Sequence, residues 1–261
     1  MIEPDFPAPP PATPVQRRFS PLLAIFLVVL VAGAVLTGFG LVKVFSYRVV
    51  TLPGGSMDST VPPGTSVIYR LRDGEEVRRG DLVVFEAEQF TEDPGSRFVK
   101  RVIAVGGDTV ECCDARHRIE VNGKPVTEPY LDPAVTPERG ALPFKAKVPA
   151  GAIFVAGDTR DNSNDSRVYA DQPGGGAVLL SKVDGVIVAE GSLFWAKALK
   201  PTTAFTDAGL SGAATEDTGP VTARLTVAGG ALLFLIGFAG AIVAAARSAG
   251  RRRTAAAPPG H

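Results

Sequence analysis

Two long apolar runs constrain this chain more than any other feature of its sequence. Residues 21–42 carry no charged side chain, and as a helix these 22 residues reach roughly 33 Å, slightly more than the ~30 Å hydrocarbon core of a bilayer. Residues 225–246 form a second uncharged run of similar length. The sequence therefore predicts two transmembrane helices, with everything between them on one side of the membrane.

The alternative for the first run is a cleaved secretory signal. Such a signal usually has a shorter apolar region and a small-x-small cleavage site directly after it. Here the run is followed by Lys-Val-Phe-Ser-Tyr at 43–47, which offers no such site. We therefore favour an uncleaved signal anchor.

The positive charges that flank the two runs predict the orientation. Arg247 and the arginines at 251–253 follow the second run, which places the C-terminus in the cytoplasm by the positive-inside rule. The arginines at 17–18 are balanced by Lys43 and Arg48, so the first run alone is ambiguous. Because two spans return the chain to its starting side, we expect both termini to be cytoplasmic and the middle to be extracytoplasmic.

The middle of the chain reads as strands and turns, so the predicted fold class is mainly β. Short apolar or alternating runs are typical of strands, and Asn122-Gly123 between two of them predicts a hairpin. We expect these divisions: 1–20, a disordered cytoplasmic tail; 48–107 and 151–196, a β-barrel or sheet core; 108–150, an inserted β lobe; 197–220, a flexible linker; and 247–261, a cytoplasmic tail.

Composition excludes several classes of function. Lys plus Arg and Asp plus Glu both number 27, so no basic excess points to nucleic acid. The only two histidines, His117 and His261, argue against histidine metal sites and against a Ser-His-Asp triad. Cys112 and Cys113 are adjacent, which rarely satisfies disulfide geometry, and no CxxC spacing exists. We expect no metal and no organic cofactor.

Four segments of the middle region carry a recognisable pattern. They are Leu-Pro-Gly-Gly-Ser-Met-Asp-Ser-Thr at 52–60, Gly-Asp-Leu-Val-Val-Phe at 80–85, Phe-Val-Lys-Arg-Val-Ile-Ala-Val-Gly-Gly-Asp at 98–108, and Gly-Asp-Thr-Arg-Asp-Asn-Ser-Asn-Asp-Ser-Arg at 157–167. In this order, over residues 50–195, the chain resembles the bacterial type I signal peptidases. The resemblance implies a membrane-anchored serine endopeptidase of the plasma membrane that removes N-terminal signal peptides from exported preproteins.

The resemblance implies a Ser-Lys dyad, with Ser56 as nucleophile and Lys100 as general base. On a strand, Lys100 shares a face with Phe98 and Val102. A lysine on such a face is ordinarily a surface residue with an apolar stem. The functional interpretation is a buried lysine whose charged form is disfavoured, so that its neutral amine takes the proton of Ser56. The scarcity of histidine fits this reading.

The resemblance also assigns supporting and binding roles. Ser163 would hydrogen-bond and orient the Lys100 amine, Asp165 would pair with Arg167, and Asp158 would pair with Arg101. The substrate would bind extended beside a strand edge, with small side chains at the first and third positions before the cut. The expected lining residues are Leu52, Pro53, Met57, Val84, Phe98 and Val99.

Two positions depart from patterns found in the family. Many members carry proline where this chain has Ser59, which predicts a less rigid turn after the nucleophile. Some members place an oxyanion-stabilising hydroxyl where this chain has Gly54. The oxyanion hole would then rest on backbone N–H groups, chiefly that of Ser56.

The expected partners are signal peptides of exported preproteins and the lipid bilayer, with no nucleic acid. Two alternatives remain. The self-cleaving repressor proteases share a Ser-Lys dyad, but membrane spans argue against them. A membrane-anchored β domain that binds a partner without catalysis is the non-enzyme alternative, and the presence of both Ser56 and Lys100 disfavours it.

Overall fold

A computed structural model describes residues 20–71, 77–134, 142–192, 195–212 and 216–255 of the chain. The chain divides into two compact units, residues 1–37 with 228–261, and residues 38–227. The predicted N-terminal tail at 1–20 lies outside the described residues except for Ser20, as do residues 256–261 of the predicted C-terminal tail.

Two apolar helices dominate the first unit, and residues 38–44 of one and 219–227 of the other belong to the second. They are α1, Pro21–Val44, and α3, Gly219–Ala255, and both are long and apolar enough to cross a membrane by length and composition. Both exceed the predicted runs because hydrophobicity marks only the apolar part of a helix. Pro220 is tolerated in the first turn of α3, and the Ala- and Arg-rich end is made of strong helix formers.

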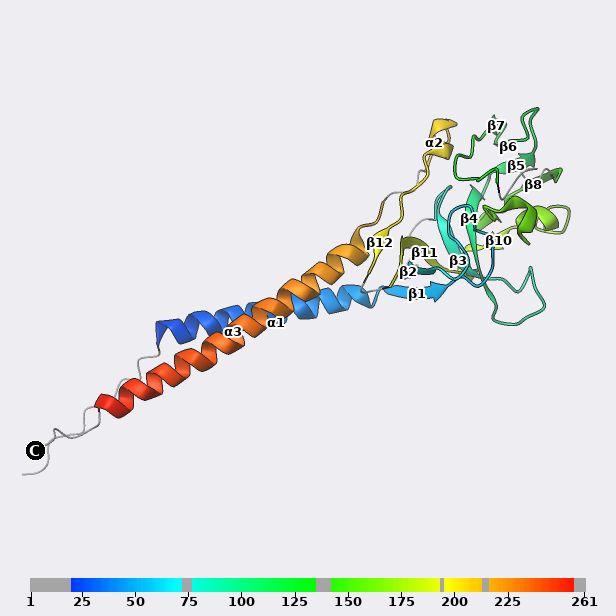
Figure 1. The fold of residues 1–261 in the computed structure, drawn as a ribbon. Helices are drawn as coiled ribbons and strands as arrows, with labels where there is room; N and C mark the ends of the chain where they lie inside the picture. The colour runs from blue at the N-terminus through cyan, green and yellow to red at the C-terminus, as the bar shows by residue number, and fades with distance from the viewer. Residues whose placement is uncertain (1–19, 72–76, 135–141, 193–194, 213–215, 256–261) are drawn as a thin grey trace, which may run out of the picture. The chain divides into compact units, whose positions relative to one another are not determined.

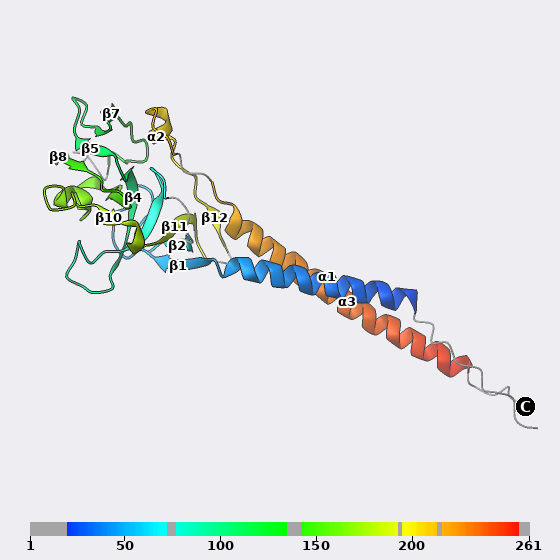
Figure 2. The same cartoon turned by 180° about the vertical axis from the view of Figure 1, so that it is seen from behind.

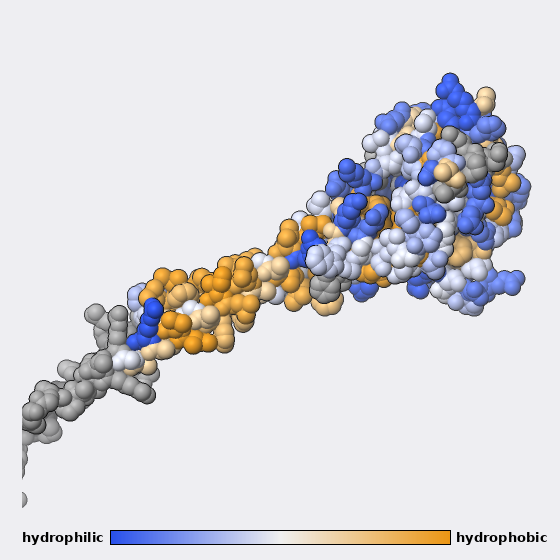
Figure 3. Space-filling model, in the orientation of Figure 1, coloured by the Kyte–Doolittle hydropathy of each residue, from blue (hydrophilic) through white to orange (hydrophobic). Residues whose placement is uncertain are grey.

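The two helices lie side by side within this unit, and glycines line their contact (Figures 1 and 2). A methyl group added at any of these glycines would collide with the other helix. The contacts place Gly33 against Phe234, Gly230 against Thr37, Gly237 against Leu30 and Gly240 against Phe26. Apolar residues cover the helices in the space-filling view (Figure 3). Small residues thus allow close backbone approach, as in membrane helix pairs.

The second unit is built on an eight-stranded antiparallel sheet (Figure 1). The strand order is β1-β2-β11-β3-β4-β9-β10, and β12 also pairs with β11. The strands are β1 Tyr47–Thr51, β2 Ser66–Leu71, β3 Leu82–Glu86, β4 Arg97–Val105, β9 Ala152–Ala156, β10 Val178–Leu179, β11 Val183–Glu190 and β12 Lys197–Ala198. The mainly β prediction is confirmed.

A separate four-stranded sheet is inserted between β4 and β9. Its order is β7-β6-β5-β8, with β5 Thr109–Cys112, β6 Ile119–Val121, β7 Lys124–Pro125 and β8 Phe144–Lys147. Asn122 and Gly123 both have positive φ, 54° and 71°, as a tight hairpin between β6 and β7 requires. This sheet occupies the residues expected to form the inserted lobe.

The second unit also contains short helices. The packing of one of them differs from the flexible linker predicted at 197–220. They are η1 Arg160–Asn162, η2 Ser166–Tyr169, η3 Leu180–Lys182 and α2 Ala204–Asp207. Phe205 of α2 is only 1% exposed and packs in the same apolar cluster as Phe154 and Val110. Residues 197–212 are therefore packed against the domain and do not form a free linker, because Phe205 and Leu210 supply apolar area among the Thr, Ala and Gly residues.

The adjacent cysteines also differ from the expectation. A disulfide joins Cys112 to Cys113, and the peptide bond between them is cis, with the Cα atoms 3.0 Å apart. Adjacent cysteines rarely satisfy disulfide geometry, so the sequence did not predict this bond.

Candidate active site

Ser56 and Lys100 lie side by side in the lining of a cleft in the second unit. Ser56 lies in a turn after β1, and Lys100 lies in the middle of β4, where only 3% of its surface is exposed. The Lys100 Nζ to Ser56 Oγ distance is 2.6 Å, which is a hydrogen bond. Both faces of β4 are covered, because Lys100 and its neighbours Val99 and Arg101 are all buried, and Lys100 is thus not the surface residue that such a strand position ordinarily holds.

The environment of Lys100 favours its neutral form. Burial lowers the pKa of Lys100 to about 8; nearby Asp165 opposes this shift, and the charge of Arg167 adds to it. The Phe98 ring lies 5.1 Å from the ammonium nitrogen and forms part of the apolar surroundings. An amine that loses its proton near neutral pH can accept one from a serine hydroxyl.

The loop at 157–167 holds the turn that carries the serine. The backbone N–H of Thr159 donates to the Ser56 carbonyl at 3.0 Å. Gly157 lies so close to that carbonyl and to the Ser163 side chain that an added Cβ would collide with both. The Ser59 hydroxyl donates to the Asp158 carbonyl at 3.1 Å. Ser59 thus tethers the turn that was expected to be less rigid at this position.

Asp165 is the acceptor at the centre of this loop. Its carboxylate accepts from Gly157 N at 2.9 Å, from Ser163 Oγ at 2.6 Å, and from Arg167 Nε and Nη2, each at 2.9 Å. Burial acts to raise the pKa of Asp165, but the charge of Arg167 and these donors outweigh it and lower the pKa. The expected pairing of Asp165 with Arg167 is present.

The expected hydrogen bond between Ser163 and the Lys100 amine is not present. Within the part of the chain that the structure describes, Lys100 Nζ bonds to Ser56, and the Ser163 hydroxyl donates to Asp165. The Ser163 hydroxyl proton is donated to the charged carboxylate, and the Lys100 amine is directed at Ser56. Ser163 therefore supports the loop through Asp165.

Arg101 and Asp158 form the second expected pair. Arg101 Nε and Nη2 donate to the two Asp158 carboxylate oxygens at 2.9 and 2.6 Å, and both side chains are buried. Thr60, which the sequence argument missed, donates to Asp158 Oδ2 at 2.5 Å. These bonds tie β4 to the loop after β9 and to the serine turn.

The cleft beside Ser56 has a volume of about 300 Å³. Five of the six expected lining residues border it: Leu52, Pro53, Val84, Phe98 and Val99. Met57 does not; it is 1% exposed and packs in the core beneath the turn, where its sulfur accepts from Asp158 N. The cleft is also bordered by five residues that were not predicted to line it: Val50, Thr51, Arg97, Asn162 and Asn164. The two asparagines fall within the 157–167 segment, so the segment itself pointed to them.

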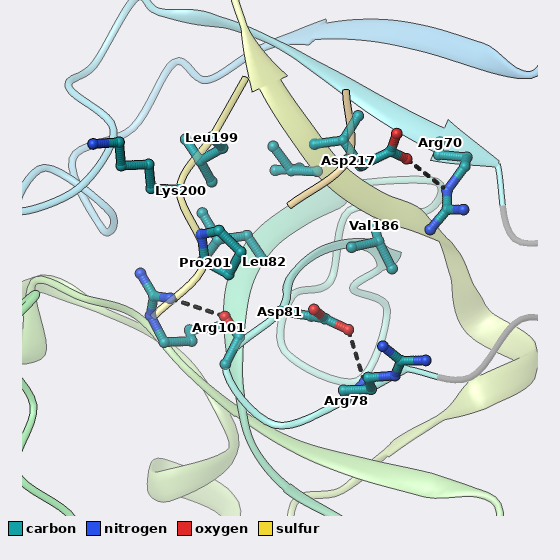
Figure 4. A pocket seen from close by; sticks show the side chains of 13 residues that line it. Arg70, Arg78, Asp81, Leu82, Arg101, Val186, Leu199, Lys200, Pro201 and Asp217 are labelled. Atoms are coloured by element: carbon teal, nitrogen blue, oxygen red, sulfur yellow. Dashed lines mark hydrogen bonds and ion pairs between the residues drawn. The ribbon is translucent and has the colours of Figure 1, made fainter. Parts of the chain in front are cut away.

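A second cavity of about 330 Å³ lies beside Arg101 and contains neither Ser56 nor Lys100 (Figure 4). Arg101 borders it where Nη1 bonds to the Gly80 carbonyl. Arg70 pairs with Asp217 at 3.3 Å, and burial raises the pKa of Asp81 to about 6. The residues that line this second cavity carry both positive and negative charges, unlike the apolar cleft at the serine. Among the described residues, no cluster of His, Cys, Asp or Glu could hold a metal ion.

Chemically, the site pairs a serine hydroxyl with a lysine amine beside an apolar cleft. A family model described as signal peptidase, peptidase S26, matches residues 20–190. Signal peptidase I of Bacillus licheniformis is 35% identical over 136 residues, covering 49% of this chain and 69% of that protein. Signal peptidase I of Pseudomonas fluorescens is 32% identical over 218 residues, covering 69% and 70%. This chain belongs to the signal peptidase family, peptidase S26.

Other similar proteins match a smaller share of this chain. Signal peptidase I of Mycobacterium tuberculosis is 42% identical over 99 residues, and the match spans 33% of each chain. A crystal structure of a signal peptidase I from Enterococcus faecalis is 30% identical with a TM-score of 0.34, covering 43% of this chain and 97% of that one.

Proposed function

We propose that this protein is a membrane-bound serine endopeptidase that cleaves N-terminal signal peptides after small residues, with Ser56 as nucleophile and Lys100 as general base. The observation that carries the assignment of residues is the 2.6 Å contact between a buried lysine and a serine hydroxyl at the end of an apolar cleft. Membership of the signal peptidase family supports the class of substrate.

The chemistry is acyl transfer in two halves. Neutral Lys100 takes the proton of Ser56 as Oγ attacks the scissile carbonyl, and the protonated amine then gives that proton to the leaving amine. This leaves an acyl-enzyme on Ser56. Lys100 next takes a proton from water, which attacks the ester, and returns the proton to Ser56 as the acid leaves.

The oxyanion of each tetrahedral intermediate needs hydrogen-bond donors. Considering the described residues only, no hydrogen bond uses the backbone N–H of Ser56, so this donor is available. Gly54 has no side chain to contribute, and the space around its Cα is open. We therefore assign the Ser56 N–H as the chief donor of the oxyanion hole.

The cleft suits an extended apolar segment with small side chains. Strand β1 supplies one wall through Val50 and Thr51, and β4 supplies the other through Phe98 and Val99. An extended peptide between them gains backbone hydrogen bonds at the sheet edge. We propose that Leu52, Pro53 and Val84 complete shallow pockets for small residues before the cut.

The proposal also includes the orientation of the chain in the membrane. With α1 and α3 crossing the plasma membrane and both termini in the cytoplasm, the β-rich unit faces the outside. Ser56 follows Val44, the end of α1, by 12 residues and lies within roughly 43 Å of it even for a fully extended chain. A signal peptide presents its cleavage site just beyond its own apolar segment, so the nucleophile and its target lie at similar depth.

The decisive experiment is incubation of the purified full-length protein in detergent or vesicles with a preprotein. We expect release of the mature protein, identified by its new N-terminus, and no release by Ser56→Ala. Binding of the preprotein without cleavage by the wild-type protein would instead favour the non-catalytic binding module.

A further inference from the structure

A buried ion pair joins the inserted lobe to the 157–167 loop. Glu128 follows β7 in the inserted lobe, and Arg160 begins η1. Arg160 Nη1 donates to Glu128 Oε2 at 2.9 Å and Nη2 donates to Oε1 at 2.5 Å. The Arg160 and Glu128 side chains are only 2% and 5% exposed. The fork of the guanidinium thus fixes both position and angle of the arginine.

Tyr130 fixes the carboxylate from its other side. Its hydroxyl donates to Glu128 Oε1 at 2.6 Å, and burial raises the pKa of Tyr130 well above 10, so the hydroxyl keeps its proton. The Arg101 guanidinium lies 3.9 Å from the Tyr130 ring centroid. The same short segment of the lobe therefore touches both Arg160 and the neighbour of Lys100 in β4.

Arg160 in turn holds the parts of the loop that contact the serine turn. Its Nε donates to the Gly157 carbonyl at 2.9 Å, and its own carbonyl accepts from Arg167 Nη2 at 2.9 Å. The adjacent residue, Thr159, holds the Ser56 carbonyl. Two steps of hydrogen bonding thus lead from Glu128 to the backbone of the nucleophile.

We propose that Glu128 is a positioning residue for the cleavage reaction. It acts through Arg160 to hold the 157–167 loop, and hence Ser56 Oγ, against Lys100 Nζ. The inserted lobe thereby shapes the active site without touching the substrate, since neither Glu128 nor Arg160 lines the cleft. A buried ion pair adds little net stability over an apolar pair of similar size, so the geometry that the pair imposes is the better account of it.

The test rests on the proposed function and uses a double variant, Glu128→Met/Arg160→Met. The apolar pair leaves no buried charge unpaired, but it removes the partners of the Tyr130 hydroxyl and the Gly157 carbonyl, so we expect a folded protein with a moderately lower melting temperature. We expect kcat to fall on the order of 10- to 100-fold, because about 1 Å of misplacement can cost 10²-fold. KM should change less than kcat, because only Asn162 and Asn164 of the loop border the cleft. A loosened loop admits water to Lys100, so the acidic limb of the kcat/KM profile should move to higher pH.

The matched control is Glu111→Ala, which breaks an exposed pair with Lys145 in the same lobe, and it should behave as wild type. Cleavage by the wild-type protein and its loss in Ser56→Ala establish the proposed function separately, whatever the double variant does. A folded double variant with wild-type kcat and pH limb would overturn the positioning role. If the double variant does not fold, Tyr130→Phe decides: it removes one hydroxyl, and kcat should fall several-fold, whereas an unchanged kcat would refute the proposal.

Discussion

At the scale of single residues, the site depends on Lys100. A lysine side chain ordinarily lies at the surface, but this one is buried. An ordinary lysine has a pKa of about 10.4 and is charged at neutral pH. Burial in β4 lowers that of Lys100 to about 8, which leaves a usable share of neutral amine. The sequence placed Lys100 on an apolar strand face, but only the packing of the sheet shows that its side chain is buried.

The pH dependence of cleavage should follow this value. Below about pH 8 the Lys100 amine carries a proton and cannot act as a base, so kcat/KM should fall as pH is lowered through that value. Lys100→Ala and Lys100→Arg should both abolish cleavage, since arginine stays charged. His117→Ala should leave the profile unchanged. Activity in Lys100→Ala, or a limb that disappears in His117→Ala, would remove the dyad.

Gly54 offers a second test on one residue. Its backbone has no positive φ and no atom lies within 4 Å of an added Cβ, so a side chain fits there. Gly54→Ser should therefore keep activity or raise it, by no more than the 10²- to 10³-fold that one oxyanion donor is worth. Single-turnover cleavage rates measure this. A large loss with an unchanged melting temperature would show that glycine is needed there for its conformation.

At the scale of elements, the 157–167 loop and the helix pair each depend on contacts between segments far apart in sequence. The loop is rich in short polar residues and would ordinarily read as a solvated surface turn. Instead Asp158, Asp165 and Arg167 are almost completely buried, because each charge meets a partner inside the loop or on β4.

Two substitutions in this loop should distinguish a side chain needed mainly for the rate of cleavage from one needed for the stability of the fold. Asp165→Ala breaks the buried ion pair with Arg167, which typically costs 3–5 kcal/mol, so we expect a large drop in melting temperature. Ser163→Ala removes one hydrogen bond, worth about 1 kcal/mol, and should lower kcat with a small change in stability. Thermal unfolding and initial rates compare the two. Equal drops in melting temperature would contradict the distinction.

The helix pair predicts a position-dependent effect of glycine substitution. Gly237→Leu places a side chain into the backbone of α1 at Leu30 and should weaken the pairing of α1 with α3. Gly229→Leu, on the same helix with open space around it, is the matched control. Amide hydrogen exchange of α1 in detergent measures the pairing. Equal exchange in the two variants would show that the contact does not hold the helices together.

At the scale of the whole molecule, the proposed orientation of the two apolar helices predicts on which side of the membrane the chemistry takes place. Both helices are long enough to cross a bilayer, and the arginines at 247 and 251–253 follow the apolar part of α3. Protease added to intact spheroplasts should digest the β-rich unit and spare a tag at the C-terminus. A tag that is removed from outside would overturn the two-span orientation.

The sequence by itself determined the features that are local or periodic. Uncharged runs of membrane length predicted α1 and α3, alternation predicted the strands, Asn122-Gly123 predicted its hairpin, and the order of four segments predicted the family and the dyad. These features need only neighbours along the chain, so they can be read from it.

Only the tertiary structure decided which distant side chains meet. It moved Met57 from the cleft wall into the core, turned Ser163 toward Asp165, packed Phe205 into the domain and joined Glu128 to Arg160. Each outcome depends on where two separate segments come to rest and on which acceptor is nearest. Hydrogen bonds and burial are set by distances in space, and spacing along the chain does not carry them.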